Sequence, residues 1–198
     1  MFAQPACVVS PTSFCNPVGG GSVYLMSTSS NVDLTFDSFG KFVGGITQSG
    51  GTVLKLAITE AAAPCRWQLH ANVDNGGGLT PVTEWELITP YGAAGPPHPT
   101  VDLLDMRIRN QCNTSLSGTS FVDIPNINQT IDIVENPGAD VLPGAGTCAL
   151  NQNVNTEGTY LTDYGQYAFT VDYRVLPTLT LRPGIYQLTV RYCLTEDN

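Results

Sequence analysis

The sequence predicts an all-β protein whose antiparallel strands, about ten in number, form a sandwich. Apolar residues recur with a period of two along several segments. Glycine and proline, 20 and 14 of the 198 residues, interrupt the chain without a collagen-like period, and helical spacing never persists for two turns. Because 42% of the residues are apolar, the chain can bury a core, and disorder fits badly.

Alternation of apolar and polar residues marks the predicted strands, since a strand with one buried face turns every second side chain inward. The long alternating segments are Thr52–Thr59, Cys65–Val73, Leu104–Arg109, Tyr167–Val175 and Tyr186–Leu194. The shorter candidates are Val23–Met26, Val32–Phe36, Val82–Ile88, Phe121–Ile124 and Thr130–Val134. In this pattern His70 and Asp172 fall on polar faces, and Trp67 falls on a buried one.

Turn residues separate these strands within one domain, residues 23–198. Arg182-Pro183-Gly184 predicts a turn between the last two long segments, in which Pro183 fixes one φ and Gly184 takes a positive φ. The Pro90–Pro99 stretch is expected to resist strand pairing because proline lacks the amide donor. A second long loop is expected from Glu135 to about Glu157. No shift in composition marks a linker.

Cysteine usage indicates disulfides formed in an oxidising compartment. The six cysteines are Cys7, Cys15, Cys65, Cys112, Cys148 and Cys193. Their number is even and no CxxC motif is present, which disfavours metal binding, although six buried thiols are the alternative. The favoured pairs are Cys7 with Cys15, Cys112 with Cys148 and Cys65 with Cys193, while other connectivities stay open. The first pair would close an N-terminal segment, residues 1–22.

Charge and composition limit the cellular compartments and the classes of binding partner that fit this chain. The formal net charge of −9 disfavours binding to nucleic acid or to anionic lipid. No apolar run is long enough for a transmembrane helix. Lysine is rare, and threonine, serine, asparagine and glycine fill the polar positions, as is typical of extracellular bacterial β-proteins. The start Phe2-Ala3-Gln4 resembles the end of an export signal, so we expect a secreted or cell-surface protein; a native cytoplasmic start is the alternative.

No residues are assigned a catalytic role. The chain has two histidines, His70 on a predicted polar strand face and His98 in a proline-rich loop, and both are expected to be exposed. No GxSxG motif is present. Glu84 and Glu86 would project from one strand face about 7 Å apart, near the separation of paired glycosidase carboxylates. Because catalytic pairs usually come from different strands, we interpret Glu84 and Glu86 as a solvated face.

Two aromatic residues are the candidate ligand-binding residues. Trp85 and Tyr91 border the Pro90–Pro99 loop, where their rings could stack on a sugar. No metal ligands and no cofactor are assigned. A structural Ca²⁺ is the one alternative, because acidic residues and asparagines cluster at Asp74-Asn75, from Asn136 to Asp140 and at Asp163. No DxDxDG loop occurs, and ordinary turn chemistry is the favoured explanation of these clusters.

The C-terminal stretch Tyr167–Leu194 (YAFTVDYRVLPTLTLRPGIYQLTVRYCL) resembles the closing strands of secreted bacterial Ig-like sandwiches, including fimbrial and pilus-type subunits. Val32–Ile46 (VDLTFDSFGKFVGGI) is similar to their first pairing segment. The resemblance implies an Ig-like sandwich in an exported surface or appendage protein, with a jelly roll as the other arrangement, and transfers no binding residue. The sequence departs from these subunits in its six cysteines and in Gln4–Ser22, a poor donor strand because Cys7 and Cys15 tie it.

The functional expectation is therefore a non-enzymatic structural or adhesive subunit of the fimbrial or filament-like kind. Its expected partners are like subunits or a surface ligand such as a glycan. The first alternative is a carbohydrate-binding module that uses Trp85 and Tyr91. The second alternative is a secreted hydrolase.

Overall fold

A computed structural model describes residues 23–27, 31–58, 67–76, 83–92, 95–110, 120–124, 130–134 and 168–196. Within these residues the chain is mostly β-strand, with one short helix and one 3-10 turn, and every strand pairing is antiparallel. The all-β prediction is confirmed. The elements are β1 (Val23–Ser27), α1 (Phe39–Gly44), β2 (Ile46–Ile58), β3 (Trp67–Asp74), β4 (Glu86–Pro90), η1 (Val101–Leu103), β5 (Leu104–Asn110), β6 (Val122–Asp123), β7 (Ile131–Val134), β8 (Ala168–Val175), β9 (Gly184–Gln187) and β10 (Thr189–Glu196).

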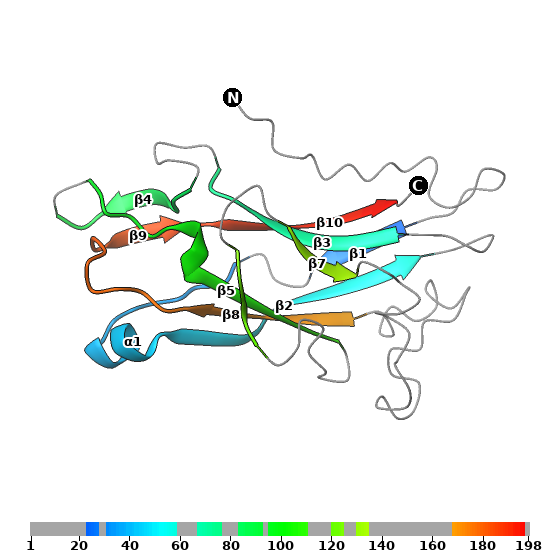
Figure 1. Cartoon of the computed structure of the whole chain (residues 1–198), viewed down its shortest axis with the longest axis horizontal. Coiled ribbons are helices and arrows are strands. Elements are labelled where there is room, and N and C mark those ends of the chain that lie inside the picture. The colour runs from blue at the N-terminus through cyan, green and yellow to red at the C-terminus, as the bar shows by residue number, and fades with distance from the viewer. Residues whose placement is uncertain are drawn as a thin grey trace.

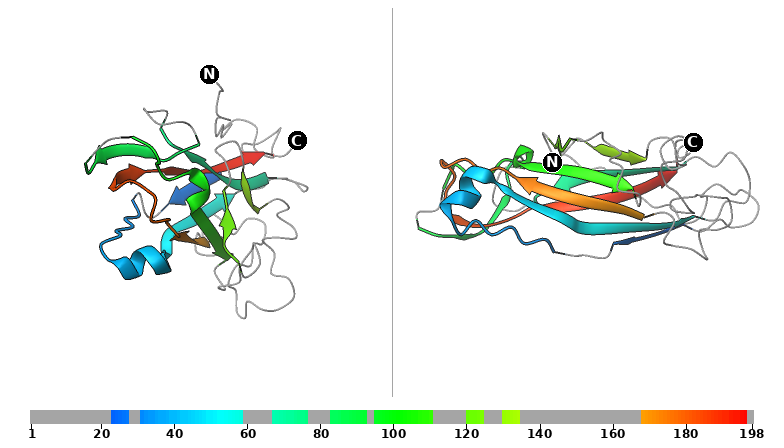
Figure 2. Two further views of the ribbon diagram at one scale, coloured as in Figure 1. Left: turned by 60° about the vertical axis from the view of Figure 1, so that its left-hand side comes forward. Right: turned by 90° about the horizontal axis from the view of Figure 1, so that it is seen from below.

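The strands form three antiparallel sheets. The largest has the order β1-β2-β8-β5-β6, the second has the order β10-β3-β7, and β4 and β9 form a separate ribbon. The long strands of the two larger sheets, among them β2, β3, β8 and β10, run along the long axis of the molecule (Figures 1 and 2). Figure 1 shows α1, β4 and β9 gathered at one end, whereas β10 finishes at the other.

One hydrophobic core joins the two larger sheets. Leu54, Met106 and Phe169 from the five-stranded sheet belong to the same buried cluster as Leu69 and Leu194 from the three-stranded sheet. Each of these side chains is at most 1% exposed. Full burial of such a side chain stabilises a fold by about 1.5–3 kcal/mol relative to exposure. The two sheets are therefore held together mainly through this shared apolar layer.

The predicted alternation holds in the central strands. In β5, Leu104, Met106 and Ile108 are buried, and Arg107 and Arg109 on the other face are partly exposed; Asp105 on that face is buried. In β8 the core residues are Phe169, Val171, Tyr173 and Val175. These strands are readable from sequence because the period of two reports which face is buried.

Three hydroxyl groups form a chain of contacts that links the two larger sheets through the core. The Tyr173 hydroxyl on β8 lies 2.7 Å from Thr52 Oγ1 on β2 and 2.5 Å from the Tyr192 hydroxyl on β10. Burial raises the pKa of both tyrosines; hydrogen bonds from Thr52 and Tyr192 oppose this rise in the pKa of Tyr173. A satisfied polar network inside an apolar core fixes how the two sheets register on each other.

Residues 32–36 are not a strand, although the sequence predicts one. Val32, Leu34 and Phe36 pack against the core and their neighbours are exposed, so the alternation is present without a paired ladder. The helix α1 follows, with the Ser38 side chain accepting a hydrogen bond from the Lys41 amide at 3.4 Å. An N-cap of this kind satisfies one of the free amides of the first helical turn. Alternation thus reports burial of one face but not strand pairing.

The C-terminal hairpin also differs from its prediction. The segment Tyr186–Leu194 is divided at Leu188 into β9 and β10, which belong to different sheets. Gly184 is not among the glycines with positive φ; it opens β9 opposite Pro90. A Cβ at Gly184 would lie 2.9 Å from the Thr89 carbonyl oxygen, so close strand approach explains this glycine. The turn lies earlier, at residues 179–180.

Several predicted features fall outside the described residues. They are residues 1–22, the Glu135–Glu157 loop, the Asn136–Asp140 and Asp163 acidic clusters, Cys7, Cys15, Cys65, Cys112 and Cys148. The side chain of Trp67 is also outside them.

Candidate functional site at the β4–β9 end

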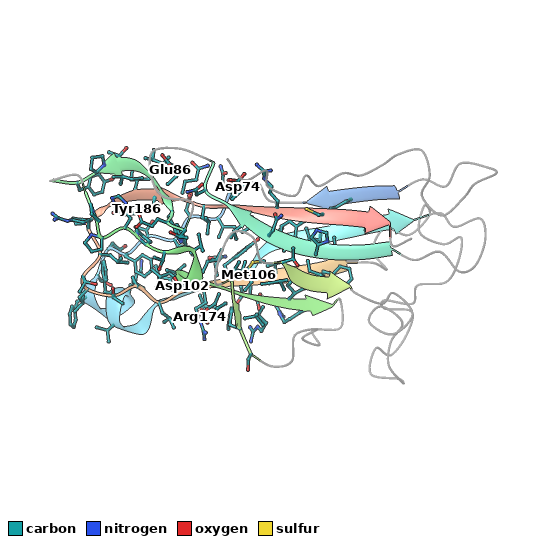
Figure 3. The ribbon with its side chains drawn as sticks, turned by 45° about the horizontal axis from the view of Figure 1, so that its top comes forward. Asp74, Glu86, Asp102, Met106, Arg174 and Tyr186 are labelled. Atoms are coloured by element: carbon teal, nitrogen blue, oxygen red, sulfur yellow. The ribbon has the colours of Figure 1, made fainter. Side chains whose placement is uncertain are left out.

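The β4–β9 ribbon and the loop before η1 build the candidate site. Leu87 pairs in register with Tyr186, and the chain irregularity between Leu87 and Thr89 bulges β4. Figure 3 shows Glu86 and Tyr186 at this end of the molecule, away from Met106 in the core layer. The loop is tied down by hydrogen bonds from the Trp85 amide to the Pro99 carbonyl at 2.8 Å and from the Val101 amide to the Thr83 carbonyl at 3.0 Å.

A glutamate–histidine pair lies under the ribbon. His98 Nδ1 is 2.9 Å from Glu84 Oε2, and the two side chains are 11% and 21% exposed. Both expectations, an exposed His98 and a solvated Glu84, are therefore wrong. Glu84 forms an isolated bridge with Thr100, which brings the proline-rich loop and its histidine onto the carboxylate. The sequence gives no signal for this contact, because the pairing depends on how the loop folds back.

The histidine ring is further enclosed by β9. The Tyr186 ring centroid lies 6.0 Å from that of His98, and the Tyr186 hydroxyl donates to the Arg182 carbonyl at 2.9 Å. Burial raises the pKa of Tyr186, the Glu84 charge adds to the rise, and the Arg182 charge opposes it. The Arg182 amide and Nε donate to the Pro97 and Pro96 carbonyls, each at 3.2 Å. These bonds fasten the loop to the ribbon.

This geometry limits what His98 can do chemically. If Nδ1 donates to the Glu84 carboxylate, Nε2 is the atom left to accept a proton. His98 Nε2 is buried and has no hydrogen-bond partner among the described residues. A general base must reach the proton that it removes, and this nitrogen is buried. The Glu84–His98 contact joins the proline-rich loop to the residues before β4.

The two predicted ligand-binding aromatics have different environments. Trp85 is partly buried against the core, and its indole N–H donates to the Thr100 carbonyl at 3.0 Å. Tyr91 is 56% exposed and its amide donates to the Pro183 carbonyl at 3.0 Å. Tyr91 therefore presents a ring to solvent, whereas much of Trp85 is used in packing.

Within the described part of the chain, the large apolar side chains that are exposed lie at this end. They are Phe39, Val43, Ile88, Tyr91, Leu176, Leu179 and Ile185. They belong to α1, to β4 and the residue after it, to β9 and to the β8–β9 connection, which Figure 1 shows together. We call this set the apolar end. Single exposed apolar residues are ordinary on protein surfaces, whereas a large contiguous apolar patch is typical of an interaction site.

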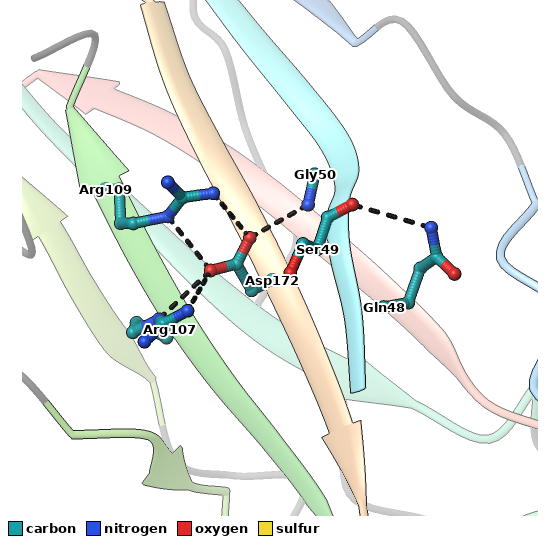
Figure 4. Close-up of polar contacts among 6 residues, drawn as sticks. All are labelled: Gln48, Ser49, Gly50, Arg107, Arg109 and Asp172. Atoms are coloured by element: carbon teal, nitrogen blue, oxygen red, sulfur yellow. Dashed lines mark hydrogen bonds and ion pairs between the residues drawn. The ribbon is translucent and has the colours of Figure 1, made fainter. Parts of the chain in front are cut away.

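A second polar cluster lies on the opposite face of β8 from the core. Asp172 is fully buried, although its position predicts a polar face; it accepts hydrogen bonds from Arg107 Nη2 at 2.7 Å, Arg109 Nε at 2.9 Å and the Gly50 amide at 2.8 Å (Figure 4). Burial alone would raise the pKa of Asp172, but these bonds outweigh it and lower the pKa. Two arginines spaced by one residue on a predicted polar face are the sequence signal that could have located this cluster.

At the Asp74-Asn75 turn, a candidate calcium site, the polar side chains are bound to other groups of the protein. The Asp74 carboxylate is paired with Arg191 and accepts a hydrogen bond from the Gly76 amide at 2.8 Å. Asn75 Nδ2 donates to the Glu84 carbonyl at 3.1 Å. A carboxylate neutralised by a guanidinium is a poor calcium ligand, so the residues at this turn do not fit the ion. Within the described part of the chain, no three His, Cys, Asp or Glu side chains gather as metal ligands.

Cys193 is the one cysteine that the described residues include. It lies in β10, is 1% exposed and is not a free thiol. Its face of β10 is expected from the alternation to be polar, yet Cys193 and Leu194 are both buried. Both faces of β10 are therefore covered at Cys193 and Leu194.

Comparison of the sequence with known protein families and with curated proteins finds no match. In the described part of the chain, none of the helical segments has the length and apolar character needed to cross a membrane.

Proposed function

We propose that this chain is an exported, non-enzymatic structural subunit, a disulfide-linked β-sandwich that attaches to like subunits through its apolar end. The observation that carries the proposal is the apolar end itself. Ile88 and Ile185, 52% and 47% exposed, lie on the neighbouring strands β4 and β9, and Leu179 is 68% exposed in the connection beside them. Side chains of this size gain most when another surface covers them.

Charge favours a second copy as the partner at this surface. The net charge of −9 makes copies repel each other over most of their surfaces. The exposed residues of the apolar end are uncharged, and Lys41 and Asp37 beside Phe39 pair with each other at 2.9 Å. Contact at this end therefore brings few like charges together while burying apolar area.

A mechanical role agrees with how the polar groups are used. Asp172, Asp105 and Asp74 are all buried and each is bound to an arginine on a neighbouring strand. Such pairs hold strands in register, and removal of one partner is costly. The shared core of the two larger sheets supports a sandwich, and buried Cys193 supports a disulfide within it.

Assembly measurements with a matched pair of variants test the proposal. Ile88→Thr with Ile185→Thr keeps the β-branched shape and adds a hydroxyl to each exposed side chain. Thr130→Ser, at an exposed position before β7, is the control. Sedimentation velocity is expected to show concentration-dependent assembly in wild type and in the control, and its loss in the double variant. Equal assembly of all three proteins would overturn the proposed surface.

A carbohydrate-binding module is the second candidate, because the Tyr91 ring is exposed and can stack on a sugar. A glycan array probed with wild type and with Tyr91→Ala separates the two proposals. Saturable binding that disappears in Tyr91→Ala supports the module. Binding that persists in Tyr91→Ala, or no binding by wild type, removes Tyr91 as its platform.

A further inference from the structure

The short helix α1 presents one apolar face to solvent. Phe39 and Val43, four residues apart, lie on the same side of the helix and are 73% and 65% exposed. Phe42, one residue before Val43, is partly buried and packs on Phe36, with the ring centroids 5.4 Å apart. The helix therefore uses one aromatic ring in its own packing and exposes the other.

Contacts at both ends of α1 hold it in this orientation. Lys41 Nζ donates to the Thr35 carbonyl at 3.2 Å and pairs with Asp37 at 2.9 Å, which joins the helix to the residues before it. At the other end the backbone of Gly45 lies close to the end of β8, because a Cβ there would be 2.7 Å from the Val175 carbonyl oxygen. The exposed face of α1 is thus set by the fold.

The β4–β9 ribbon has one covered face and one exposed face. Leu87 and Tyr186 pair in register and are partly buried, and the Tyr186 ring centroid lies 6.0 Å from that of His98. Ile185 alternates with Tyr186 onto the other face of β9 and is 47% exposed. Ile88, at the bulge of β4, is 52% exposed. The ribbon is therefore a β-layer whose outer apolar face is open to a second layer.

Within one chain, α1 and the ribbon do not cover each other. Figure 1 shows them at the same end of the molecule, and the left view of Figure 2 shows them on different sides of that end. With both elements in place, Phe39, Val43, Ile88 and Ile185 still expose 47–73% of their surface. An apolar helix face and an apolar sheet face are layers that pack on each other. One chain carries both layers and joins neither to the other.

A second copy of the chain is the partner that fits both faces. In the part of the chain that the structure describes, the large exposed apolar side chains all lie at this end, so another copy offers them the same end. The charges beside α1, Lys41 and Asp37, pair with each other, so α1 approaches the ribbon and the exposed Arg182 of another copy without net like charge. Ribbon against ribbon would instead bring two copies of Arg182 to one contact.

We propose that two copies meet end to end, with α1 of each copy packed on the β4–β9 ribbon of the other. The inference rests on the proposed attachment through the apolar end and names the surfaces that meet there. Because both faces lie at one end, a two-fold axis forms the contact twice, once in each direction. Assembly through this surface closes at a pair, and a longer array requires a further surface.

Complementation between two variants tests this contact. The helix variant carries Phe39→Gln and Val43→Gln, and glutamine is at least as good a helix former as the residues it replaces. The ribbon variant carries Ile88→Thr and Ile185→Thr. All four side chains are exposed, so the core stays as it is in both variants. Asn31→Gln, at an exposed position outside the apolar end, is the control.

A mixed pair of the two variants keeps one intact contact, between α1 of the ribbon variant and the ribbon of the helix variant. A pair formed by either variant alone keeps none. Native mass spectrometry of an equimolar mixture, with one variant isotopically labelled, counts mixed and unmixed pairs. We expect mixed pairs to outnumber both kinds of unmixed pair together, and to associate about tenfold or more tightly than either variant alone. The control is expected to pair as wild type does.

Two results would overturn the contact between α1 and the ribbon and leave the proposed attachment standing. One is self-association of the helix variant as strong as that of wild type. The other is a mixture in which mixed pairs are fewer than unmixed ones, because a mixed pair loses both contacts if α1 meets α1 and ribbon meets ribbon. A wild type that stays monomeric would overturn the attachment and this contact together.

Isotope-filtered NMR on wild type provides a measurement that needs no substitution. Labelled and unlabelled copies are mixed, so that the observed nuclear Overhauser effects join protons of different copies. We expect such effects between Phe39 or Val43 of one copy and Ile88 or Ile185 of the other. Effects that join Val43 to Val43, with none from α1 to the ribbon, would contradict the proposed contact.

Discussion

The hydroxyl of Tyr173 lies 2.5 Å from the hydroxyl of Tyr192, and this contact joins β8 of the five-stranded sheet to β10 of the three-stranded sheet. Tyr173 also contacts Thr52 Oγ1 at 2.7 Å. The Tyr173 hydroxyl therefore contacts a hydroxyl on each of the two larger sheets, in a polar network that spans the core.

This arrangement predicts unequal costs for the two hydroxyl groups. Tyr192→Phe removes one contact and leaves Tyr173 bonded to Thr52, at a cost of about 1 kcal/mol. Tyr173→Phe removes both of the contacts that the Tyr173 hydroxyl makes, at a cost of about 1–3 kcal/mol. Urea unfolding should therefore rank Tyr173→Phe as the less stable variant. Equal midpoints, or the reverse order, would contradict the network.

Asp172 predicts a strong and pH-dependent contribution to stability. Asp172→Asn leaves Arg107 and Arg109 without their carboxylate and should lower the free energy of unfolding by about 3 kcal/mol. Because the pKa of Asp172 is lowered in the folded state, its contribution is present above the unfolded pKa and is lost as the pH falls through the folded one. Unfolding curves between about pH 2 and about pH 7 measure this. Asp33→Asn, at an exposed carboxyl, is the control, and an equal loss in both variants would refute the assignment.

We predict that alanine has opposite effects on the stability of the fold at two glycine positions. Gly184→Ala places a methyl group 2.9 Å from the Thr89 carbonyl oxygen and 3.0 Å from Leu87 Cδ1, and should destabilise the fold by about 1–3 kcal/mol. Gly40→Ala in α1 meets nothing within 4 Å and should stabilise it by about 0.5–1 kcal/mol. Thermal unfolding of the two variants beside wild type provides the comparison. A stabilised Gly184→Ala would mean that β4 and β9 are farther apart.

The proposed disulfides predict sensitivity to reduction. Each bridge contributes about 2–4 kcal/mol, so a strong reductant should lower the Tm by many degrees. Mass spectrometry of unreduced protein treated with an alkylating agent gives the number of free thiols directly. We expect no alkylated cysteine. Six alkylated cysteines, together with a Tm that does not change under reductant, would show that the thiols are not paired.

The all-β class and the central strands could be predicted from the sequence because they rest on local periodicity. Leu104, Met106 and Ile108 alternate with charged residues, and such a pattern has one simple packing solution. The same rule fails at Val32, Leu34 and Phe36, because a segment can bury alternate side chains without a neighbouring strand to pair with.

The candidate site was less predictable, because its contacts join residues that are distant along the chain. Asp172 is 65 residues from Arg107, and a polar position in an alternating strand does not reveal that two arginines will cover it. Glu84 and His98 are 14 residues apart, and their contact depends on how the proline-rich loop returns to the sheet. Sequence spacing identified Tyr91 as an aromatic beside that loop, but only the fold shows that its ring is exposed and that Trp85 is largely used in packing.

The assembly state of the native protein decides whether this chain is a self-associating subunit. Light scattering over a range of concentrations, with negative-stain microscopy of the same samples, measures whether copies associate and in what form. If copies attach through the apolar end, we expect ordered oligomers or filaments that dissociate when Ile88 and Ile185 are both replaced by threonine. A monomer at every concentration, with the apolar end intact, would contradict it.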